Sequence, residues 1–265
     1  MKIKTKLVGR IEIPADKCVF LDHVKLRDED YSNRKLVQFG TFGSHLEACH
    51  FNGIRLDNNA YIQLGSGQEA SEFVECSFDG ARLHGGGGFS RFVRCSFKNV
   101  DLRNWTCLRT EFIGCIFSGN LRKCAFNGTV PEADRAWVGR DRNEFYDNDF
   151  SAADLIEVDF RTGIDLTQQH LPSGVKYLYL INPLPAIEAA RANVLGWTNF
   201  EHRRIALIML KTMEEEVAQG QRQLFLRESD HYGSSAFPRE AVKNVFALLR
   251  GGAENMKRCT GLGAP

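Results

Sequence analysis

The sequence lacks any long hydrophobic run. Among its 265 residues, 43% of them hydrophobic and 25% charged, no stretch reaches the roughly 18 apolar residues that a membrane-spanning helix needs. The first residues, MKIKTKLVGRIEIPADK, alternate polar with apolar side chains and have no continuous apolar core of the kind found in a signal peptide. Because the composition is that of an ordinary globular protein, we expect a cytoplasmic protein with no membrane contact.

An excess of one charge is also missing, and cysteine is sparse. The chain has 34 Lys and Arg against 33 Asp and Glu, a net charge of +1, so nothing attracts nucleic acid to the chain as a whole. By segment, the net charge is −2 over residues 1–175 and +3 over the remainder. Eight cysteines are too few for a disulfide scaffold of this length, and without a secretion signal we expect reduced thiols.

The motifs of common enzyme classes are absent. The sequence contains no GxSxG, no HExxH and no P-loop. Its seven histidines are scattered, and the adjacent pairs Asp22–His23 and Asp230–His231 need not bring their side chains together. Cys259 precedes a glycine-rich tail, TGLGAP, and is not expected to be a nucleophile. We therefore predict no catalytic residue, no metal site and no cofactor.

What the sequence does contain is a repeat with a period of five. Large apolar residues follow one another at five-residue steps, as in Phe92, Phe97 and Leu102, and a small residue such as Cys95 stands two positions before each. Neither the helical period of 3.6 nor the strand period of 2 explains this spacing. A chain that turns a corner at every fifth position does, and four such sides make a coil of 20, the spacing between Cys95 and Cys115.

In such a coil the large residue points inward and the small one fills the space beside it. A bulky side chain at the small position would overpack the interior at a cost of roughly 1–3 kcal/mol, and cysteine serves there as a small, polarizable hydrophobe. The cysteines lack the closely spaced pairing of a zinc site, so we interpret them as core residues. The predicted repeat core consists of Phe51, Phe78, Phe92, Phe97, Leu102, Phe112, Phe117, Phe150, Leu155, Phe160, Cys76, Cys95 and Cys115.

The stretches ECSFDGARL, RCSFKNVDL and FSAADLIEVDF resemble the pentapeptide-repeat family, whose consensus is a small residue, Asp or Asn, Leu or Phe, and then a polar pair. The resemblance is clearest over 45–166, and weaker repeats reach back to Cys18. It implies a mainly β fold, a right-handed, four-sided parallel β-helix, which we assign to residues 1–180. Some family members mimic the size and charge of duplex DNA, bind type II topoisomerases and protect them from quinolones or peptide toxins.

Three segments interrupt the repeat, near 57–71, 84–90 and 127–143, and insertions in solenoids often bind partners. The second, HGGGGFS, predicts a flexible corner rather than a phosphate loop, because no Lys-Ser/Thr follows the glycines. The third carries tryptophan and arginine, which dominate binding hot spots. It either binds a partner or folds back onto the β-helix wall. The predicted partner-binding residues are Arg135, Trp137, Arg140 and Arg142.

The sequence beyond Leu180 predicts a small α-helical domain over 185–252 and a flexible tail over 253–265. INPLP, at 181–185, is a connector with two prolines. A first helix starts near Pro185. A second starts at the capping-box spacing of Thr198 to Glu201, has one apolar face and ends at Gly220. The apolar face of the second helix consists of Ile205, Ile208, Met209, Met213 and Val217.

Two further helices are predicted after Gly220. QRQLFLRES is expected to continue as a helix, and the last helix runs from Pro238 to Arg250 with Gly251 as its stop signal. The stretch from Arg203 to Glu228 resembles the helical hairpin that follows the repeats in some bacterial pentapeptide proteins. The end of a β-helix exposes unpaired backbone, so the helices could cap it, form a homodimer or bind a partner.

These observations favour a non-enzymatic protein-binding module: an inhibitor, immunity protein or adaptor that acts through the β-helix walls, loops and helical domain. The expected partner is another protein, such as a toxin, a topoisomerase or a signalling protein, with no direct nucleic-acid binding. The alternative is a DNA mimic that protects a type II topoisomerase, although DNA carries one charge per ~1.7 Å of axis and this segment only −2 in total. A third reading is an enzyme or small-ligand protein with a site at the domain junction.

Overall fold

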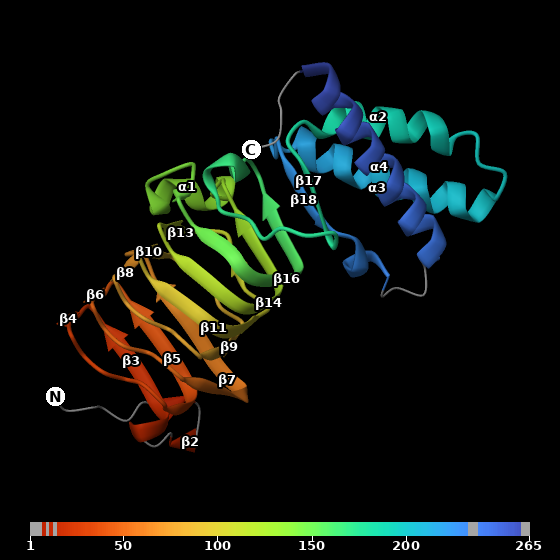
Figure 1. Cartoon of the computed structure of the whole chain (residues 1–265). Helices are drawn as coiled ribbons and strands as arrows, with labels where there is room; N and C mark the ends of the chain where they lie inside the picture. The colour runs from red at the N-terminus through yellow and green to blue at the C-terminus, as the bar shows by residue number, and fades with distance from the viewer. Residues whose placement is uncertain (1–6, 9–10, 13–14, 233–237, 261–265) are drawn as a thin grey trace. The chain divides into compact units, whose positions relative to one another are not determined.

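The computed structural model describes residues 7–8, 11–12, 15–232 and 238–260. The chain divides into two compact units (Figure 1). The β-helix unit comprises Met1–Asp159 and Gln168–Pro172, and the helical unit comprises Phe160–Thr167 and Ser173–Pro265. No described helix is long and apolar enough to cross a membrane.

Two parallel sheets form the β-helix unit (Figure 1). The first stacks six strands in the spatial order β15, β13, β10, β8, β6 and β4, which are Phe145–Tyr146, Thr110–Ile113, Ser90–Val93, Ser71–Val74, His45–Glu47 and Lys25–Arg27. The second stacks β12, β14, β11, β9, β7, β5 and β3, with β16 also paired to β14. Their bounds are Thr106–Cys107, Ile116–Asn127, Ser96–Arg103, Arg82–His84, Arg55–Ser66, Lys35–Phe42, Cys18–Asp22 and, for β16, Asp149–Arg161. A short antiparallel pair, β1 (Leu7–Val8) and β2 (Ile11–Glu12), precedes them.

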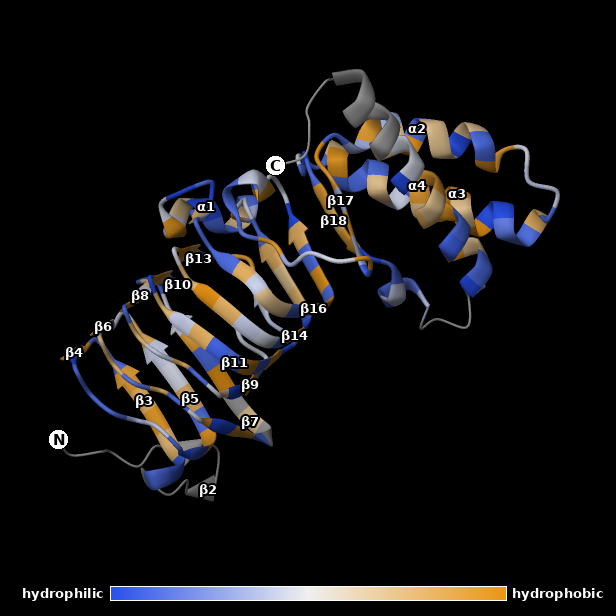
Figure 2. Cartoon of the chain, viewed as in Figure 1, coloured by the Kyte–Doolittle hydropathy of each residue, from blue (hydrophilic) through white to orange (hydrophobic). Residues whose placement is uncertain are grey.

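The strand register confirms the predicted four-sided coil. Phe92 lies opposite Phe112 in the first sheet, one predicted coil further along the chain. Between them the chain buries Phe97, Leu102 and Cys107 at five-residue steps, so each side of the coil sends one residue of this series inward. Figure 2 shows hydrophobic and hydrophilic residues alternating along these strands, as expected when one face of each strand is buried. A parallel β-helix is therefore the fold of this unit.

Corners in the left-handed backbone region separate the sides of the coil. Arg94, Asn99 and Asn104 have φ angles of 50°, 54° and 55°, and they recur with the period of the repeat. In the next coil, Gly114 and Gly119 take the corresponding positions with φ angles of 62° and 90°. Asn and Gly tolerate this region better than other residues, which is why polar and glycine residues recur between the apolar positions of the repeat.

Aromatic side chains stack along the axis of the β-helix. Phe97 packs face to face with Phe78 on one side and Phe117 on the other, at ring-centroid distances of 4.8 and 4.9 Å. Phe92 belongs to a second column and meets Phe97 edge to face at 5.6 Å. Each such pair contributes about 0.5–1.5 kcal/mol beyond its buried area. The first column as a whole consists of Tyr31, Phe51, Phe78, Phe97, Phe117 and Phe150.

The glycine run at 84–90 does form a corner, since Gly85 and Gly87 have φ angles of 68° and 104°, but the run is closely packed. A Cβ on Gly86 would lie 2.5 Å from the indole nitrogen of Trp105, and one on Gly88 would lie 2.5 Å from the carbonyl oxygen of Gly65. Trp105 is 1% exposed and occupies a position that the repeat gives to a small residue. The glycines remove side chains from one coil, and the tryptophan of the next coil fills the space.

The segment 57–71 lengthens a strand rather than forming a separate loop. Strand β7 includes residues 57–66, and a register shift lies between its pairing with Leu36 and its pairing with Gln38. Lys35 pairs with Arg55, which is the spacing of a regular coil, but His45 pairs with Glu72, which is a longer step along the chain. The extra residues therefore enlarge one side of a single coil.

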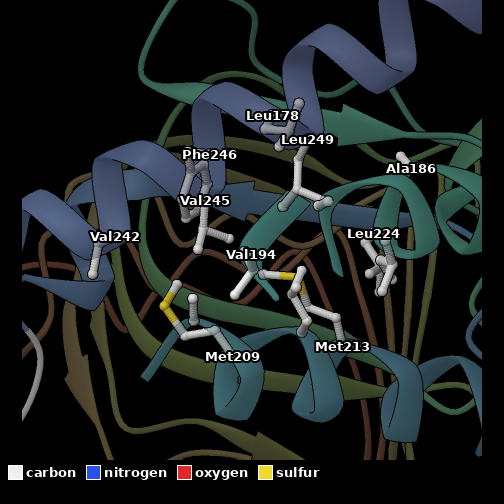
Figure 3. Close-up of a cluster of buried hydrophobic side chains, with 14 of the residues drawn as sticks. Leu178, Ala186, Val194, Met209, Met213, Leu224, Val242, Val245, Phe246 and Leu249 are labelled. Atoms are coloured by element: carbon white, nitrogen blue, oxygen red, sulfur yellow. The ribbon is translucent and has the colours of Figure 1, made fainter. Parts of the chain in front are cut away.

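Within its described residues, the helical unit contains three α-helices and a two-stranded antiparallel sheet. The helices are α2 (Pro183–Val194), α3 (Phe200–Ala218) and α4 (Arg239–Thr260), and the strands are β17 (Tyr177–Leu180) and β18 (Leu224–Arg227). Figure 3 shows the core between them, where Met209 and Met213 of α3 lie close to Val194 of α2 and Val245 of α4. Residues Phe160–Thr167, which we call the connecting segment, also belong to this unit. The buried side chain of Gln221 accepts hydrogen bonds from the backbone amides of Gly163 and Ile164 in this segment.

The helix predicted for QRQLFLRES is wrong, and so is the helical hairpin suggested for 203–228. Leu224 to Arg227 form strand β18, because its apolar residues pair with β17, with Leu180 opposite Leu224. The strand is followed by a short 3-10 turn, Glu228–His231. Pairing with a strand that precedes both α2 and α3 in the chain therefore overrides the local helical pattern.

Two helix boundaries differ from the prediction. The N-cap of α3 is Asn199, whose side chain accepts a hydrogen bond from the backbone N–H of His202, so the capping box assigned to Thr198 is wrong. Helix α4 does not stop at Gly251 but continues to Thr260, and it therefore overlaps the segment predicted as a flexible tail. A Cβ on Gly252 would lie 3.2 Å from Ala186 of α2, so this glycine allows two helices to approach closely.

The predicted apolar face of α3 is only partly buried. Ile205, Met209 and Met213 belong to the core, but Ile208 is exposed. Ala206 and Leu210 are buried in addition, so the buried stripe overlaps the predicted one but is shifted toward one side of it.

Candidate interaction surfaces

The longest interruption of the repeat, 127–143, forms a small folded insertion on the β-helix unit. It contains helix α1 (Glu132–Val138), and its two ends pair in antiparallel fashion between Thr129 and Arg142. The coil that carries it is longer than a regular one, since Phe112 finds its next partner in the sheet only at Phe145. Val130 and Val138 of the insertion bury their side chains with Phe89 of the β-helix, so the insertion has an apolar contact of its own with the wall.

Trp137 packs against this contact and remains partly exposed. Its ring meets Phe89 edge to face at 5.4 Å, and the guanidinium of Arg109 lies 5.2 Å from its centroid. The indole N–H donates a hydrogen bond to Asp134, which also forms an ion pair with Arg109 at 2.9 Å. Trp137 is 36% exposed, and neighbouring Leu108 is exposed to the same degree. An indole held in this way presents a fixed apolar edge to solvent.

Arg140 is held firmly by the β-helix wall. Its Nε lies 3.1 Å from the carboxylate of Glu111, it donates a hydrogen bond to the carbonyl oxygen of Arg109, and it covers the ring of Phe89 at 5.2 Å. Burial lowers the pKa of Arg140, and the charge of Glu111 opposes that effect. The residue therefore attaches the insertion to the wall.

The remaining two predicted binding residues lie apart from that contact. Arg135 donates a hydrogen bond from Nε to the carbonyl oxygen of Val130, 3.1 Å away, and its side chain is exposed. Arg142 is exposed next to the antiparallel bridge with Thr129. The structure thus brings Trp137 and Arg140 together around Phe89, and it leaves Arg135 and Arg142 at the solvent side of the insertion.

A chain of alternating charges crosses the outer face of the first sheet, and it was not predicted from the sequence. Arg91 lies 2.8 Å from Glu111 and 3.7 Å from Glu72, and it also pairs with Glu144. Glu72 in turn receives the ring of His45 at 2.8 Å. The sequence did contain a signal for this chain of charges, since residues of opposite charge stand about one coil apart. Stacking of the coils then places such residues side by side.

All of the residues predicted to form the repeat core lie in the interior of the protein. The thiols of Cys76, Cys95 and Cys115 lie 3.4, 3.2 and 3.5 Å from backbone carbonyl oxygens of the preceding coil, those of Leu46, Phe73 and Phe92. Burial raises the pKa of Cys95 and Cys107 and raises that of Cys124 to about 11. Within the described residues, no three His, Cys, Asp or Glu side chains come together as a metal site.

Most of the exposed large apolar side chains among the described residues belong to the helical unit. Leu195 and Phe200, which are 59% and 67% exposed, flank the turn between α2 and α3, and we call these two residues the turn patch. The sequence signal was an apolar residue on each side of GWTN that fits neither helix stripe. The full set is Leu108, Ile116, Trp137, Val175, Ile181, Leu184, Leu195, Phe200 and Ile208.

Comparisons with known proteins give no basis for assigning a function to the chain. No protein-family model matches the chain, and no curated protein matches it. Among solved structures, a trypsin-treated form of QnrB1, described as a plasmid-mediated fluoroquinolone resistance protein, matches with a TM-score of 0.28 and 15% sequence identity. The match covers 58% of this chain and 78% of that one.

Proposed function

We propose that the protein is a non-enzymatic binding module for another protein, as an inhibitor, immunity protein or adaptor. The observation that carries the proposal is the concentration of exposed apolar side chains in the helical unit, with Leu195 and Phe200 at one turn. Contiguous exposed apolar residues on soluble proteins mark interaction sites, and aromatic side chains are the commonest anchors of such interfaces. In this proposal the β-helix unit is a rigid support.

The insertion at 127–143 is a second contact in the proposal. Trp137 is fixed by Phe89, Arg109 and Asp134 and therefore loses little conformational freedom on binding, which favours affinity. Of the four residues predicted from the sequence, we keep Trp137 and the exposed Arg135 and Arg142 as partner contacts. Arg140 supports them from below, because its guanidinium is occupied by Glu111.

The experiment compares two substitutions that each introduce a negative charge at an exposed apolar position. Phe200→Glu removes the aromatic anchor, and because residue 200 is the first residue of α3, a carboxylate there favours the helix. Val175→Glu is the control, since Val175 is 94% exposed, lies in the same unit and is outside the turn patch. The tagged protein, expressed in its native host, is expected to recover one stoichiometric partner. Phe200→Glu loses this partner, whereas Val175→Glu keeps it.

Two results would contradict the proposal. One is that the unmodified protein recovers no stoichiometric partner. The other is that both variants retain the partner equally, which would remove the turn patch from the interface. Sedimentation of the purified protein is run in parallel. A dimer that Phe200→Glu abolishes would assign the patch to self-association instead.

A second candidate is protection of a type II topoisomerase. The resemblance to the pentapeptide-repeat family suggests it, and an insertion that interrupts the β-helix, as at 127–143, also occurs in members that confer quinolone resistance. Against it stands the mixed charge of the outer face that carries Glu72, Arg91 and Glu111, which differs from the uniform charge of DNA. A supercoiling assay with purified gyrase tests this candidate. If the protein neither inhibits gyrase nor protects it from a quinolone, the candidate is excluded.

A further inference from the structure

Cations recur from coil to coil on the outer face of the second sheet. Lys35 lies opposite Arg55, Arg55 opposite Arg82, and Arg103 opposite Arg122. Each neighbours a leucine of the repeat that points inward, so these side chains point outward. Stacked strands are about 4.8 Å apart. Lys35, Arg55 and Arg82 share one register position, and Arg103 and Arg122 lie two residues further along their strands, because the partner of Arg82 is Asp101 and that of Arg103 is His84. We call Lys35, Arg55, Arg82, Arg103 and Arg122 the basic ladder.

This arrangement opposes the usual pairing of charges across strands. Like charges directly opposite one another destabilise a sheet. The first sheet of the same unit follows the favourable pattern, with Arg91 between Glu72 and Glu111. In the second sheet a carboxylate intervenes only where Asp101 lies opposite Arg82, and the other steps of the ladder place like charges together. Folding alone does not require that cost.

The cations of the ladder are also largely without internal partners. Arg103 is held by Asp101 through two hydrogen bonds of 2.9 and 2.6 Å. The other four, Lys35, Arg55, Arg82 and Arg122, have exposed side chains and no ion-pair partner within the described part of the chain. Their charges are therefore available to an external anion.

The surface is hollowed along the ladder. A depression of about 520 Å³ is lined by Lys35, Arg55, Arg82 and Arg103, together with the carboxylates of Asp57 and Asp101. The bond from Arg103 holds the pKa of Asp101 below its usual range, and the charges of Arg122 and Arg82 act in the same direction. The depression thus has the size of a small-ligand site and a positive environment.

We propose that the basic ladder binds an anion made of several linked phosphate groups, either a nucleoside polyphosphate or inorganic polyphosphate. The planar guanidinium groups of Arg55 and Arg82 suit bidentate contact with phosphate oxygens. A chain of phosphates can follow the ladder from coil to coil, whereas a single anion would engage one or two of its steps. This site is separate from the proposed protein partner and does not depend on it.

Single-stranded nucleic acid fits the depression less well. Proteins that bind it without sequence preference stack the bases on exposed aromatic rings. Among the described side chains, those that line the depression include no Phe, Tyr or Trp. The carboxylates of Asp57 and Asp101 also interrupt the line of cations, which suits a short phosphate chain better than a long strand.

The test is calorimetric titration of the full chain at physiological salt with tripolyphosphate, ATP and adenosine as separate ligands. Two variants, Arg55→Gln and Arg82→Gln, remove one ladder charge each. The control, Arg94→Gln, removes the same charge from a residue that is paired with Glu75 outside the ladder. We expect saturable binding of tripolyphosphate, a loss of at least tenfold in each ladder variant, and less than twofold change in the control.

A second measurement separates binding from folding. Without ligand, Arg55→Gln is expected to melt at the same or a higher temperature than the unmodified protein, because it relieves repulsion within the ladder, while its melting shift with tripolyphosphate disappears. Equal affinity for ATP and tripolyphosphate would identify the phosphate chain as the ligand. Tighter binding of ATP would identify a nucleotide. Either result supports the site. Absence of saturable binding, equal loss in all three variants, or binding of adenosine equal to that of ATP would overturn it.

Discussion

Replacing Gly86 by alanine tests whether the glycine run and Trp105 are fitted to each other. The new Cβ would lie 2.5 Å from the indole nitrogen and 2.6 Å from a ring carbon, and another ring carbon is closer still. Unstrained carbon contacts lie near about 3.5–4.0 Å. Trp105 is fully buried and touches Phe97 edge to face, so the ring has little room to move. We expect a loss of about 3 kcal/mol, the upper part of the range for overpacking.

The assay is urea unfolding followed by far-ultraviolet circular dichroism. The matched control is Gly251→Ala in α4, where a Cβ meets no atom within 4 Å, and which should gain about 0.5–1 kcal/mol. Trp105→Ala alone should cost about 3–5 kcal/mol through the cavity it leaves. In the double variant with Gly86→Ala the clash is gone, so the combined cost should fall short of the sum by about 1–3 kcal/mol.

Two results would refute this reasoning. A Gly86→Ala protein within about 0.5 kcal/mol of the unmodified one would behave like an ordinary surface substitution, which would mean that the ring is free to move. Additive costs in the double variant would show that Gly86 and Trp105 act independently, and the space in one coil would then not be filled by the tryptophan of the next.

Three other predictions follow from the described contacts. Glu111→Gln leaves the partly buried Arg140 without its carboxylate partner and should lower the free energy of unfolding in urea by about 3 kcal/mol. Glu75→Gln, at the exposed pair with Arg94, should lower it by at most about 1 kcal/mol. Equal effects would contradict a stabilising role of the buried pair between Glu111 and Arg140. Burial raises the pKa of Cys124 from 9.0 to about 11, so the stability it contributes is present below pH about 9 and is lost toward pH about 11, by at most about 1.4 kcal/mol per pH unit. Cys124→Ala should flatten that slope, and an unchanged slope would contradict the assignment. Gln221→Ala removes the buried bonds to the connecting segment at about 1–3 kcal/mol and should speed hydrogen exchange of the Ile164 amide, and unaltered exchange would show that the segment is held by other contacts.

The β-helix could be predicted because its determinants repeat along the sequence. Phe92, Cys95 and Phe97 have equivalents in the neighbouring coils, so one rule about size and spacing covers the whole unit. The last helix was predictable for a similar reason, since Val242, Val245, Phe246 and Leu249 lie on one buried stripe. In both cases the information needed for the element lies within about one repeat or one helix.

The features that escaped prediction depend on partners that are distant in sequence or belong to no repeat. Strand β18 forms because Leu224 pairs with Leu180, and no local pattern announces that pairing. The fit of Gly86 to Trp105 requires knowledge that neighbouring coils stack there. The turn patch was missed because Leu195 and Phe200 lie outside both helix stripes, and the sequence does not show whether an apolar residue outside a stripe is exposed or buried. Arg140 was predicted as a binding residue, but its contact with Glu111 is visible only once the coil is built.

Recurring cysteine and phenylalanine residues mark stacked coils of a parallel β-helix, and the conclusions about the β-helix unit depend on that stacking. The most direct test is nuclear magnetic resonance of the deuterated protein, with measurement of couplings across backbone hydrogen bonds. The fold predicts couplings from the amide of Arg94 to the carbonyl of Ile113 and from the amide of Ile116 to the carbonyl of Cys95, which are 2.8 and 3.0 Å apart. Couplings of the helical i to i−4 kind, or an antiparallel pattern in 90–127, would contradict it.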